Sequence, residues 1–393
     1  MKGIYLCLCL LVMLATAADT KKAPTTTKNV MGDVFQSFLN LIPYMNNEMK
    51  FRDSKNETLI RNNLHKLTNA FEHAKHLKKI NSPGFRPSYD VIVEHLKHTK
   101  ETFDSGNKVF ARTRLKATTQ ICMTCHSQLE RGASRNIKKK LESVTRGSFS
   151  SDFDYADFLY LTRNFNKAEV YYRNEIRNRI EKNKRLRKIQ KSKEAHFLDY
   201  TIEKSIKRLI TLHTKINYNP QKAIDVMKDY KNNKNLAKKL REDIEEWEVA
   251  LKEWSKNDYR GKFTSRKQVE SFLTKNLRSL DVSSLSDGSE DMTLLVASGA
   301  LYRYLNRYPK SDIAPELLYW ISVVDQQLNF NYLYSLSGMY LKECITQYSK
   351  SPFAKKCLAK YKDDIEFGYS GSGGTFIPKE ERDEIKRLES VIK

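Results

Sequence analysis

The sequence predicts an all-α protein, and three observations support this prediction. Glycine and proline are scarce, with 14 and 9 among 393 residues, so few positions break a helix. Apolar residues recur at the three- and four-residue spacings of an amphipathic helix through most of the chain. Alternating apolar and polar runs bounded by hairpin turns do not occur, so strands are not expected.

The N-terminal segment 1–18 has the pattern of a signal peptide. Lys2 supplies a positive charge, 4–14 is an apolar run too short to span a membrane, and 15–17 has the small residues that signal peptidase recognises. We therefore expect cleavage near the end of this segment and export to the periplasm, with secretion beyond the cell as the weaker alternative. A polar linker should follow over 19–29.

The region 30–145 is expected to form four amphipathic helices joined by short turns. Pro43 should kink or shorten the first helix, because proline has no N–H and clashes with the preceding turn. Four apolar stripes are buried together most simply in an up-down-up-down bundle. The predicted stripes are Met31, Val34, Phe38, Leu41, Ile42, Met45 and Met49 in the first helix, Ile60, Leu64, Leu67, Phe71 and Ala74 in the second, Tyr89, Ile92, Leu96, Thr99 and Phe103 in the third, and Phe110, Ala117, Ile121 and Cys125 in the fourth.

Cys122, Cys125 and His126 form Cys-x-x-Cys-His, the attachment signature for c-type haem. Two thiols can add to the haem vinyl groups, and the adjacent histidine can bind the iron. The alternatives are a thioredoxin-type redox pair, a zinc half-site and a structural disulfide. The chain lacks the βαβ context of thioredoxin and a second ligand pair at zinc spacing, and a disulfide leaves His126 without a role. We therefore expect one covalently attached haem c, with His126 as the proximal iron ligand.

The position of this motif, near the end of the fourth predicted helix, resembles the cytochrome c′/cytochrome c-556 family. The resemblance rests on Met31 in the first helix, on HLKHTKETFDSGNKVFARTRLKATTQICMTCHSQL (95–129) and on domain length. It covers roughly residues 28–140, about a third of the chain. It implies a four-helix bundle that holds one haem. In low-spin c-556-type members a first-helix methionine is the distal ligand, whereas five-coordinate c′ members have a non-ligating residue there.

Antiparallel packing would place Met31 at the haem end of the bundle, because the fourth helix ends where the first begins. Met45 and Met49 lie about 21 and 27 Å further along at ~1.5 Å per residue and are expected to fill the core. Three histidines are rival ligands expected near the haem end, the last of them at the start of the third helix: His73, His76 and His95. Four others are expected at the surface or on helix flanks: His65, His98, His196 and His213.

Residues 150–367 are expected to form an array of helical hairpins that resembles tetratricopeptide (TPR) repeats. The segment 155–176 has the small and aromatic pattern of two packed helices at Tyr160, Phe165, Ala168 and Tyr171. An internal repeat aligns 301–318 with 341–358 at a period of 40 residues. Its matching pairs are Leu301 and Leu341, Tyr308 and Tyr348, Lys310 and Lys350, Ser311 and Ser351, Ala314 and Ala354, and Leu318 and Leu358. Stacked hairpins form a concave surface that mainly binds proteins; a capping scaffold without a partner is the alternative.

Cys344 and Cys357 flank the turn of the second repeat, 348–351. The facing helices of one hairpin would bring the two sulfurs within bonding range, and export leads to an oxidising compartment. We therefore expect a disulfide between them. The remaining segment, 368–393, should form a Gly/Ser-rich connector and a terminal helix.

The charge balance favours anionic partners, since 70 Lys and Arg outnumber 47 Asp and Glu and give a net charge of +23. Export argues against nucleic acid and favours an acidic redox protein or peripheral contact with an anionic membrane surface. A basic composition without a specific partner is the alternative. Together these features predict an exported monohaem cytochrome for one-electron transfer, in which the array docks a partner. A TPR-like scaffold or a gas-binding haem sensor with an open iron is the second hypothesis, and an enzyme such as a peroxidase is the third.

Overall fold

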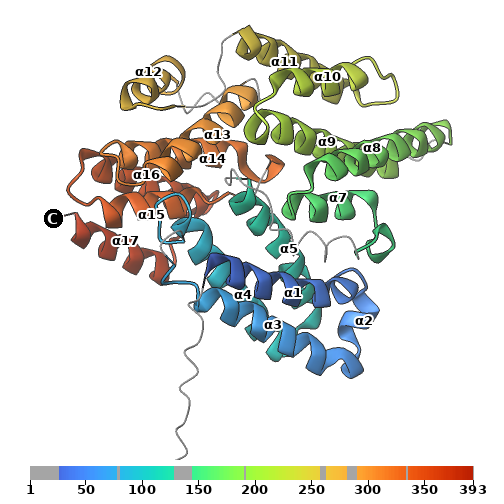
Figure 1. Cartoon of the computed structure of the whole chain (residues 1–393), viewed down its shortest axis with the longest axis horizontal. Coiled ribbons are helices and arrows are strands. Elements are labelled where there is room, and N and C mark those ends of the chain that lie inside the picture. The colour runs from blue at the N-terminus through green and yellow to red at the C-terminus, as the bar shows by residue number, and fades with distance from the viewer. Residues whose placement is uncertain are drawn as a thin grey trace, which may run out of the picture.

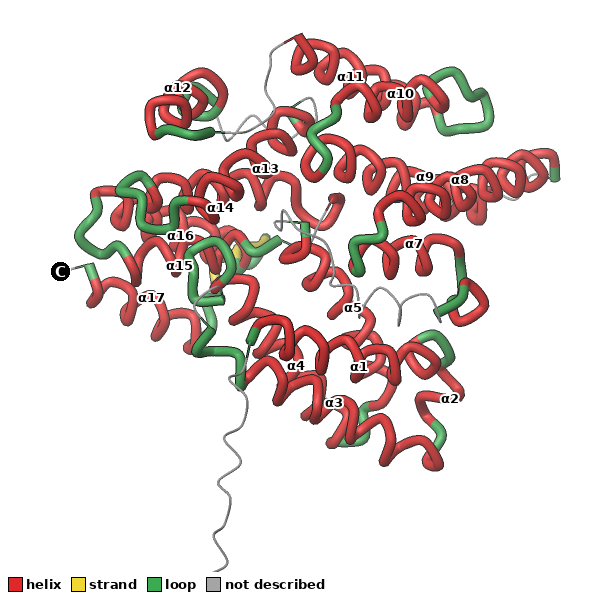
Figure 2. Tube along the Cα trace, viewed as in Figure 1, coloured by secondary structure: helices red, strands yellow, loops and turns green. Residues whose placement is uncertain are grey.

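The computed structural model describes residues 26–77, 80–127, 144–189, 192–256, 263–280, 290–332 and 335–392. The predicted signal peptide, most of the linker and the end of the predicted haem domain lie outside these ranges. Within them the all-α prediction is confirmed (Figures 1 and 2), because the described strands form a single short hairpin of β1 (Ser370–Gly371) and β2 (Gly374–Thr375).

The N-terminal helices pack in the order of the chain. Their bounds are α1 (Thr27–Met45), α2 (Glu48–Arg52), α3 (Glu57–Glu72), α4 (Arg86–Asp104) and α5 (Lys108–His126), with a 3-10 turn η1 at Ser54–Asn56. α1 packs on α3, α3 on α4 and α4 on α5, and α5 also touches α1. Arg61 near the start of α3 pairs with Asp104 at the end of α4. Arg112 near the start of α5 donates to the carbonyl oxygen of Met45 at the end of α1 at 2.9 Å. Helices α3 and α4, and likewise α1 and α5, therefore run antiparallel.

The predicted apolar stripes of α3 and α4 are buried throughout. The stripe predicted for the first helix is wrong at its last residue: Met49 is 81% exposed and does not fill the core. α1 continues through Pro43 and ends at Met45, after which Asn47 caps the separate helix α2 and breaks the register that would bury Met49.

The stripe predicted for α5 is wrong at its start. Phe110 is exposed in the first turn of the helix, where the Arg114 guanidinium lies 5.8 Å from its ring centroid. The buried face instead includes Ala111 and Leu115 and continues to Ile121. The first turn of α5 has three apolar residues in succession, Val109, Phe110 and Ala111, so the apolar pattern alone does not decide which of them faces the core.

The second region is built from stacked helices. Their bounds are η2 (Arg146–Ser148), α7 (Asp152–Leu161), α8 (Phe165–Lys188), α9 (Ser192–Thr211), a π-helical turn η3 (Leu212–Ile216), α10 (Pro220–Tyr230), α11 (Lys238–Lys256), α12 (Arg266–Asn276), α13 (Asp291–Arg307), α14 (Ala314–Tyr332), α15 (Ser337–Gln347), α16 (Pro352–Gly368) and α17 (Lys379–Val391). Neighbours along the chain pack on one another, as in α7 with α8, α8 with α9, α10 with α11, and α13 through α16. We call α7 to α17 the helical array.

The 40-residue sequence repeat corresponds to a repeated local conformation. Ser311 donates its N–H to the carbonyl oxygen of Tyr308 at 3.0 Å in the turn between α13 and α14. Ser351 makes the same bond to Tyr348, at 2.8 Å, between α15 and α16. A tyrosine and a serine at aligned positions therefore form the turn between the two helices in both hairpins.

Cys344 on α15 and Cys357 on α16 are joined by a disulfide, with their Cα atoms 6.4 Å apart. Both residues are fully buried between the two helices. The bond closes a loop with a sequence separation of 13 residues, a size for which chain entropy contributes roughly 3 kcal/mol to stability.

The helical array contacts the N-terminal bundle at its first helix and near its C-terminal end, since α5 packs on α7 and α4 packs on α15. Figure 1 shows α5 extending between these first and last parts of the array. At the α4–α15 contact, Arg86 pairs with Glu343 at 3.2 Å, and the Glu343 side chain is only 5% exposed. Close packing continues at Gly84, just before α4, where an added Cβ would clash with Oδ1 of Asn306 on α13.

The contact between α4 and α15 should make the free energy of unfolding depend on pH. Burial raises the pKa of Glu343 from 4.5 to about 7, although Arg86 opposes the change. Between these values the folded protein holds a proton that the unfolded chain has lost, so stability falls as pH rises through this window. We expect Glu343→Gln to remove this fall and to stabilise the protein by about 2 kcal/mol above the window, as measured by urea unfolding at both ends of it.

The matched control is Glu366→Gln on α16, where the carboxylate is exposed. It should leave the pH dependence of the free energy of unfolding unchanged. An equal effect of both substitutions would show that net charge, and not burial at the α4–α15 contact, causes the dependence.

Candidate functional site

Helix α5 runs through the Cys-x-x-Cys-His motif and ends at His126. Cys122 and His126 are four residues apart, so their side chains lie on the same face of the helix. Cys122 is partly buried against the hydrophobic core. The backbone of Cys125 belongs to the same turn, while its side chain lies outside the described part of the structure. One turn of α5 thus places a thiol and an imidazole on one side.

The imidazole of His126 is held by the helical array. Its Nδ1 contacts the carbonyl oxygen of Leu161, the last residue of α7. A carbonyl oxygen only accepts, so Nδ1 carries the proton and Nε2 keeps the lone pair that can bind a metal. Burial lowers the pKa of His126, which favours the neutral form, while the bond to Leu161 opposes this shift.

Arg163 contacts the same residue from the turn between α7 and α8. Its guanidinium donates to the carbonyl oxygen of His126 and lies 5.0 Å from the ring centroid of Phe165. The backbone of Arg163 is in the left-handed region, with φ of 60°, where helices that end in this way usually carry glycine. Such a conformation costs on the order of 1 kcal/mol in a residue with a side chain.

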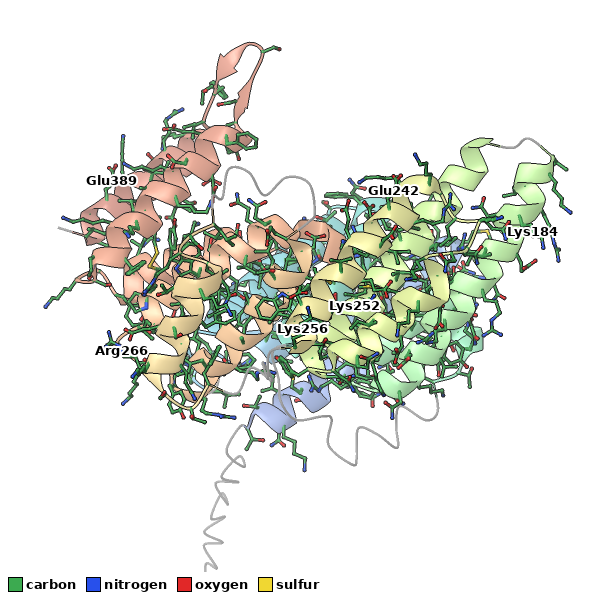
Figure 3. The ribbon with its side chains drawn as sticks, turned by 90° about the horizontal axis from the view of Figure 1, so that it is seen from above. Lys184, Glu242, Lys252, Lys256, Arg266 and Glu389 are labelled. Carbon is green, nitrogen blue, oxygen red and sulfur yellow. A yellow bond between two sulfur atoms is a disulfide. The ribbon has the colours of Figure 1, made fainter. Side chains whose placement is uncertain are left out.

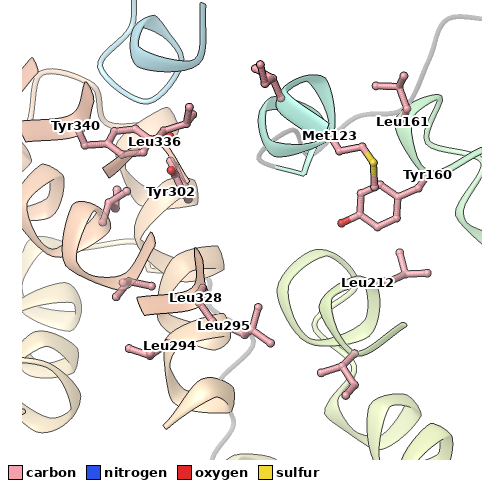
Figure 4. Close-up of a cluster of buried hydrophobic side chains, with 14 of the residues drawn as sticks. Met123, Tyr160, Leu161, Leu212, Leu294, Leu295, Tyr302, Leu328, Leu336 and Tyr340 are labelled. Atoms are coloured by element: carbon pink, nitrogen blue, oxygen red, sulfur yellow. The ribbon is translucent and has the colours of Figure 1, made fainter. Parts of the chain in front are cut away.

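Two buried polar atoms beside this motif have no hydrogen-bond partner among the described residues: the Tyr160 hydroxyl and Nε of Arg163. The Tyr160 ring packs edge-on against Phe165, with 5.4 Å between the centroids. Figure 4 shows Met123, from the motif turn of α5, and Tyr160 in one cluster of buried side chains. A buried polar group without a partner in the protein can be satisfied by ordered water or by a bound ligand.

The surroundings of Tyr160 are fixed by a buried ionic network behind it. Asp157 on α7 accepts from the Tyr172 hydroxyl of α8 and from Nε of Arg208 on α9, the latter at 3.4 Å. All three residues are buried. The network ties α7 to the next two helices, so the Leu161 carbonyl that faces His126 is held in place.

Met31 belongs to the same end of the bundle as the motif. Arg112 and Met45 are in contact, His126 lies 14 residues beyond Arg112, and Met31 lies 14 residues before Met45. Because α1 and α5 run antiparallel, both residues lie about 21 Å from that contact in the same direction, at ~1.5 Å per residue. Met31 is partly buried against the core. Its role as an iron ligand stays a prediction.

The rival histidines are engaged elsewhere or exposed. His73 is exposed, and its Nδ1 lies 2.7 Å from the carbonyl oxygen of Asn69 in its own helix. His76 is exposed as well. His95 lies in the middle of α4 and not at its start as predicted, and its Nε2 lies 2.7 Å from the carbonyl oxygen of Arg114. His73 and His95 each have a ring nitrogen in contact with a backbone carbonyl oxygen, and the identity of the ligand opposite His126 stays a prediction.

The prediction that His213 lies at the surface is wrong. It is 1% exposed within the π-helical turn η3, and its Nε2 lies 3.4 Å from a carboxylate oxygen of Glu169. The wider turn moves this residue out of the register expected for a regular helix and into the array. His65 and His98 are exposed as expected, whereas the side chain of His196 lies outside the described residues.

The sequence interpretation did not include Leu161 and Arg163 in the site, and it assigned Tyr160 only to the repeat pattern. Their contacts with His126 cross 35 and 37 residues of sequence, respectively. An arginine directly after a helix end, where glycine or asparagine is usual, was the one available signal.

The donors in this part of the fold fit a c-type haem. They comprise a thiol, an imidazole with an available Nε2, and two buried polar groups that a ligand could satisfy.

Across the described ranges, no group of three or more His, Cys, Asp and Glu residues is arranged to hold a metal ion, and no helix is long and apolar enough to cross a membrane. Comparisons with protein-family models, curated proteins and solved structures found no match.

The unpartnered hydroxyl of Tyr160 allows a direct test of this fit. Tyr160→Phe should raise the free energy of unfolding of the haem-free chain by about 1 kcal/mol, because it removes a buried donor without a partner. In haem-loaded protein the gain should disappear if the hydroxyl bonds to the cofactor. Tyr172→Phe is the control: its hydroxyl bonds to Asp157, so it should destabilise both forms in thermal unfolding.

Proposed function

We propose that this protein is an exported monohaem c-type cytochrome that transfers single electrons. The observation that carries the proposal is the last turn of α5, where Cys122 and His126 share a face and the array fixes Nδ1 of His126. Cys122 and Cys125 would hold the cofactor through thioether bonds, and Nε2 of His126 would be the proximal ligand. A covalently held haem supplies a one-electron iron couple.

The choice of electron transfer over catalysis rests on the second axial ligand. Met31 lies at the motif end of the bundle in the antiparallel arrangement of α1 and α5. A methionine opposite a histidine favours reduced iron and closes the iron to exogenous ligands. The resemblance to low-spin members of the cytochrome c′/cytochrome c-556 family supports the same ligand pair.

We further propose that the helical array docks an acidic redox partner in the periplasm. Support comes from the stacked hairpins, which form an extended binding surface in repeat proteins. It also comes from four exposed cations near the end of α8: Lys182, Lys184, Arg185 and Lys188. Figure 3 shows Lys184 at one extremity of the molecule, where a partner could approach. Opposite charge on that partner would steer the encounter.

A gas-binding sensor is the second candidate function. It is favoured by the hydrogen bonds of His126 with Leu161 and Arg163, which connect the proximal side of the proposed iron to the array. In that case the iron would be open, and Met31 would be a packing residue only.

Expression together with c-type maturation factors tests the cofactor. The protein should carry one haem that remains attached after denaturation, and Cys122→Ser with Cys125→Ser should abolish the attachment. The control is the other cysteine pair, Cys344→Ser with Cys357→Ser, which removes the disulfide and should leave haem attached. A parent protein without covalent haem would contradict the proposed function.

Absorption spectra separate the two candidate functions. The haem-loaded parent should be low-spin with a weak far-red band from methionine ligation and should not bind CO. Met31→Ala should lose this band and gain CO binding, whereas Met45→Ala, in the core at the other end of α1, should do neither. A high-spin parent that binds CO would instead favour the sensor.

A further inference from the structure

Arg163 differs from the other arginine buried in this part of the fold. Arg208 is 2% exposed and has a counter-ion, because its Nε lies 3.4 Å from a carboxylate oxygen of Asp157. Arg163 is partly buried and its Nε is inaccessible, yet no described carboxylate pairs with it. Its contacts are the carbonyl oxygen of His126 and the ring of Phe165. A charge withdrawn from water is normally paired, so a partly buried guanidinium with no counter-ion among the described residues carries a cost that function can explain.

The backbone at this position adds to that cost. Arg163 has φ of 60°, a conformation in which glycine is unstrained. Glycine here would remove both the strain and the charge of the side chain. The helix end alone therefore does not account for an arginine, whereas a requirement for positive charge beside His126 does.

A fixed cation near a redox centre changes the relative stability of its two oxidation states. With neutral axial ligands, oxidised haem iron carries one more positive charge than reduced iron. A guanidinium held against the residue that binds the iron repels the oxidised form more, and this repulsion is strong where water is excluded. Arginine keeps its charge at every pH that proteins tolerate.

We propose that Arg163 is a positioning residue that raises the reduction potential of the haem iron by holding its positive charge against the backbone of His126. The inference rests on the proposed function and extends it, because the residue comes from the helical array and not from the bundle. The same hydrogen bond restrains the final peptide of α5 and, through it, the orientation of the imidazole.

The test is potentiometric titration of the haem-loaded full chain with one-electron mediators. Arg163→Gln should lower the reduction equilibrium constant at least tenfold, which is about 59 mV for a one-electron couple. Arg163→Gly removes the same charge, and glycine adopts the positive φ at this position without strain. This variant can therefore be measured if Arg163→Gln unfolds. Arg163→Lys retains the charge and should restore most of the potential. Arg177→Gln, an exposed arginine on α8, is the matched control and should have no effect because water and salt screen it.

Unchanged absorption spectra in all variants would show that the axial ligands are intact. Equal potentials in the parent, Arg163→Gln and Arg163→Gly proteins would overturn the inference while leaving the proposed function standing. An equal fall in Arg163→Lys and Arg163→Gln would also overturn it, because charge would then not be the cause. Absence of covalent haem from the parent would refute the proposed function and this inference with it.

Discussion

The contact between the end of α5 and the end of α7 is the constraint on which the candidate site depends. His126 contacts the Leu161 carbonyl through its ring and accepts a hydrogen bond from Arg163 through its backbone. Neither partner belongs to the N-terminal bundle, so both of these hydrogen bonds of His126 come from the array. The buried network around Asp157 then fixes α7 against the rest of the array. The proposed haem site is therefore a joint product of both regions.

The second junction, between α4 and α15, complements the first. Glu343 pairs there with Arg86, and Cys344 follows Glu343 directly and is bonded to Cys357. A buried ion pair contributes little net stability because desolvation offsets its attraction, but it specifies which surfaces meet. The disulfide restrains the helix that carries the carboxylate. Contacts at the first helix and near the C-terminal end of the array thus limit movement of the bundle relative to it.

Local regularity explains what the sequence could predict. The stripes of α3 and α4 follow the helical period over several turns, and the repeated turns at Tyr308 and Tyr348 share their tyrosine, lysine and serine and the same serine-to-tyrosine backbone bond. Failures occur where a local event breaks the period: a new helix cap before Met49, or a π-helical turn around His213. The partners of His126 could not be predicted from the sequence for another reason. The residues of α5 do not specify which distant turn of the chain will contact His126. Haem attachment, export and partner docking stay predictions.

A haem site held by both the bundle and the array would suit one-electron transfer. One-electron transfer changes the charge on the iron and needs no bond in the protein to form or break, so surrounding groups that stay in place reduce the energy spent on rearrangement. The bundle would supply Met31 on one side of the iron, while the array supports His126 on the other. A sensor needs the opposite property, a side that moves when the ligand changes. The contacts of His126 with the array would transmit such movement, so the choice between the two functions depends on whether Met31 closes the iron to a gas.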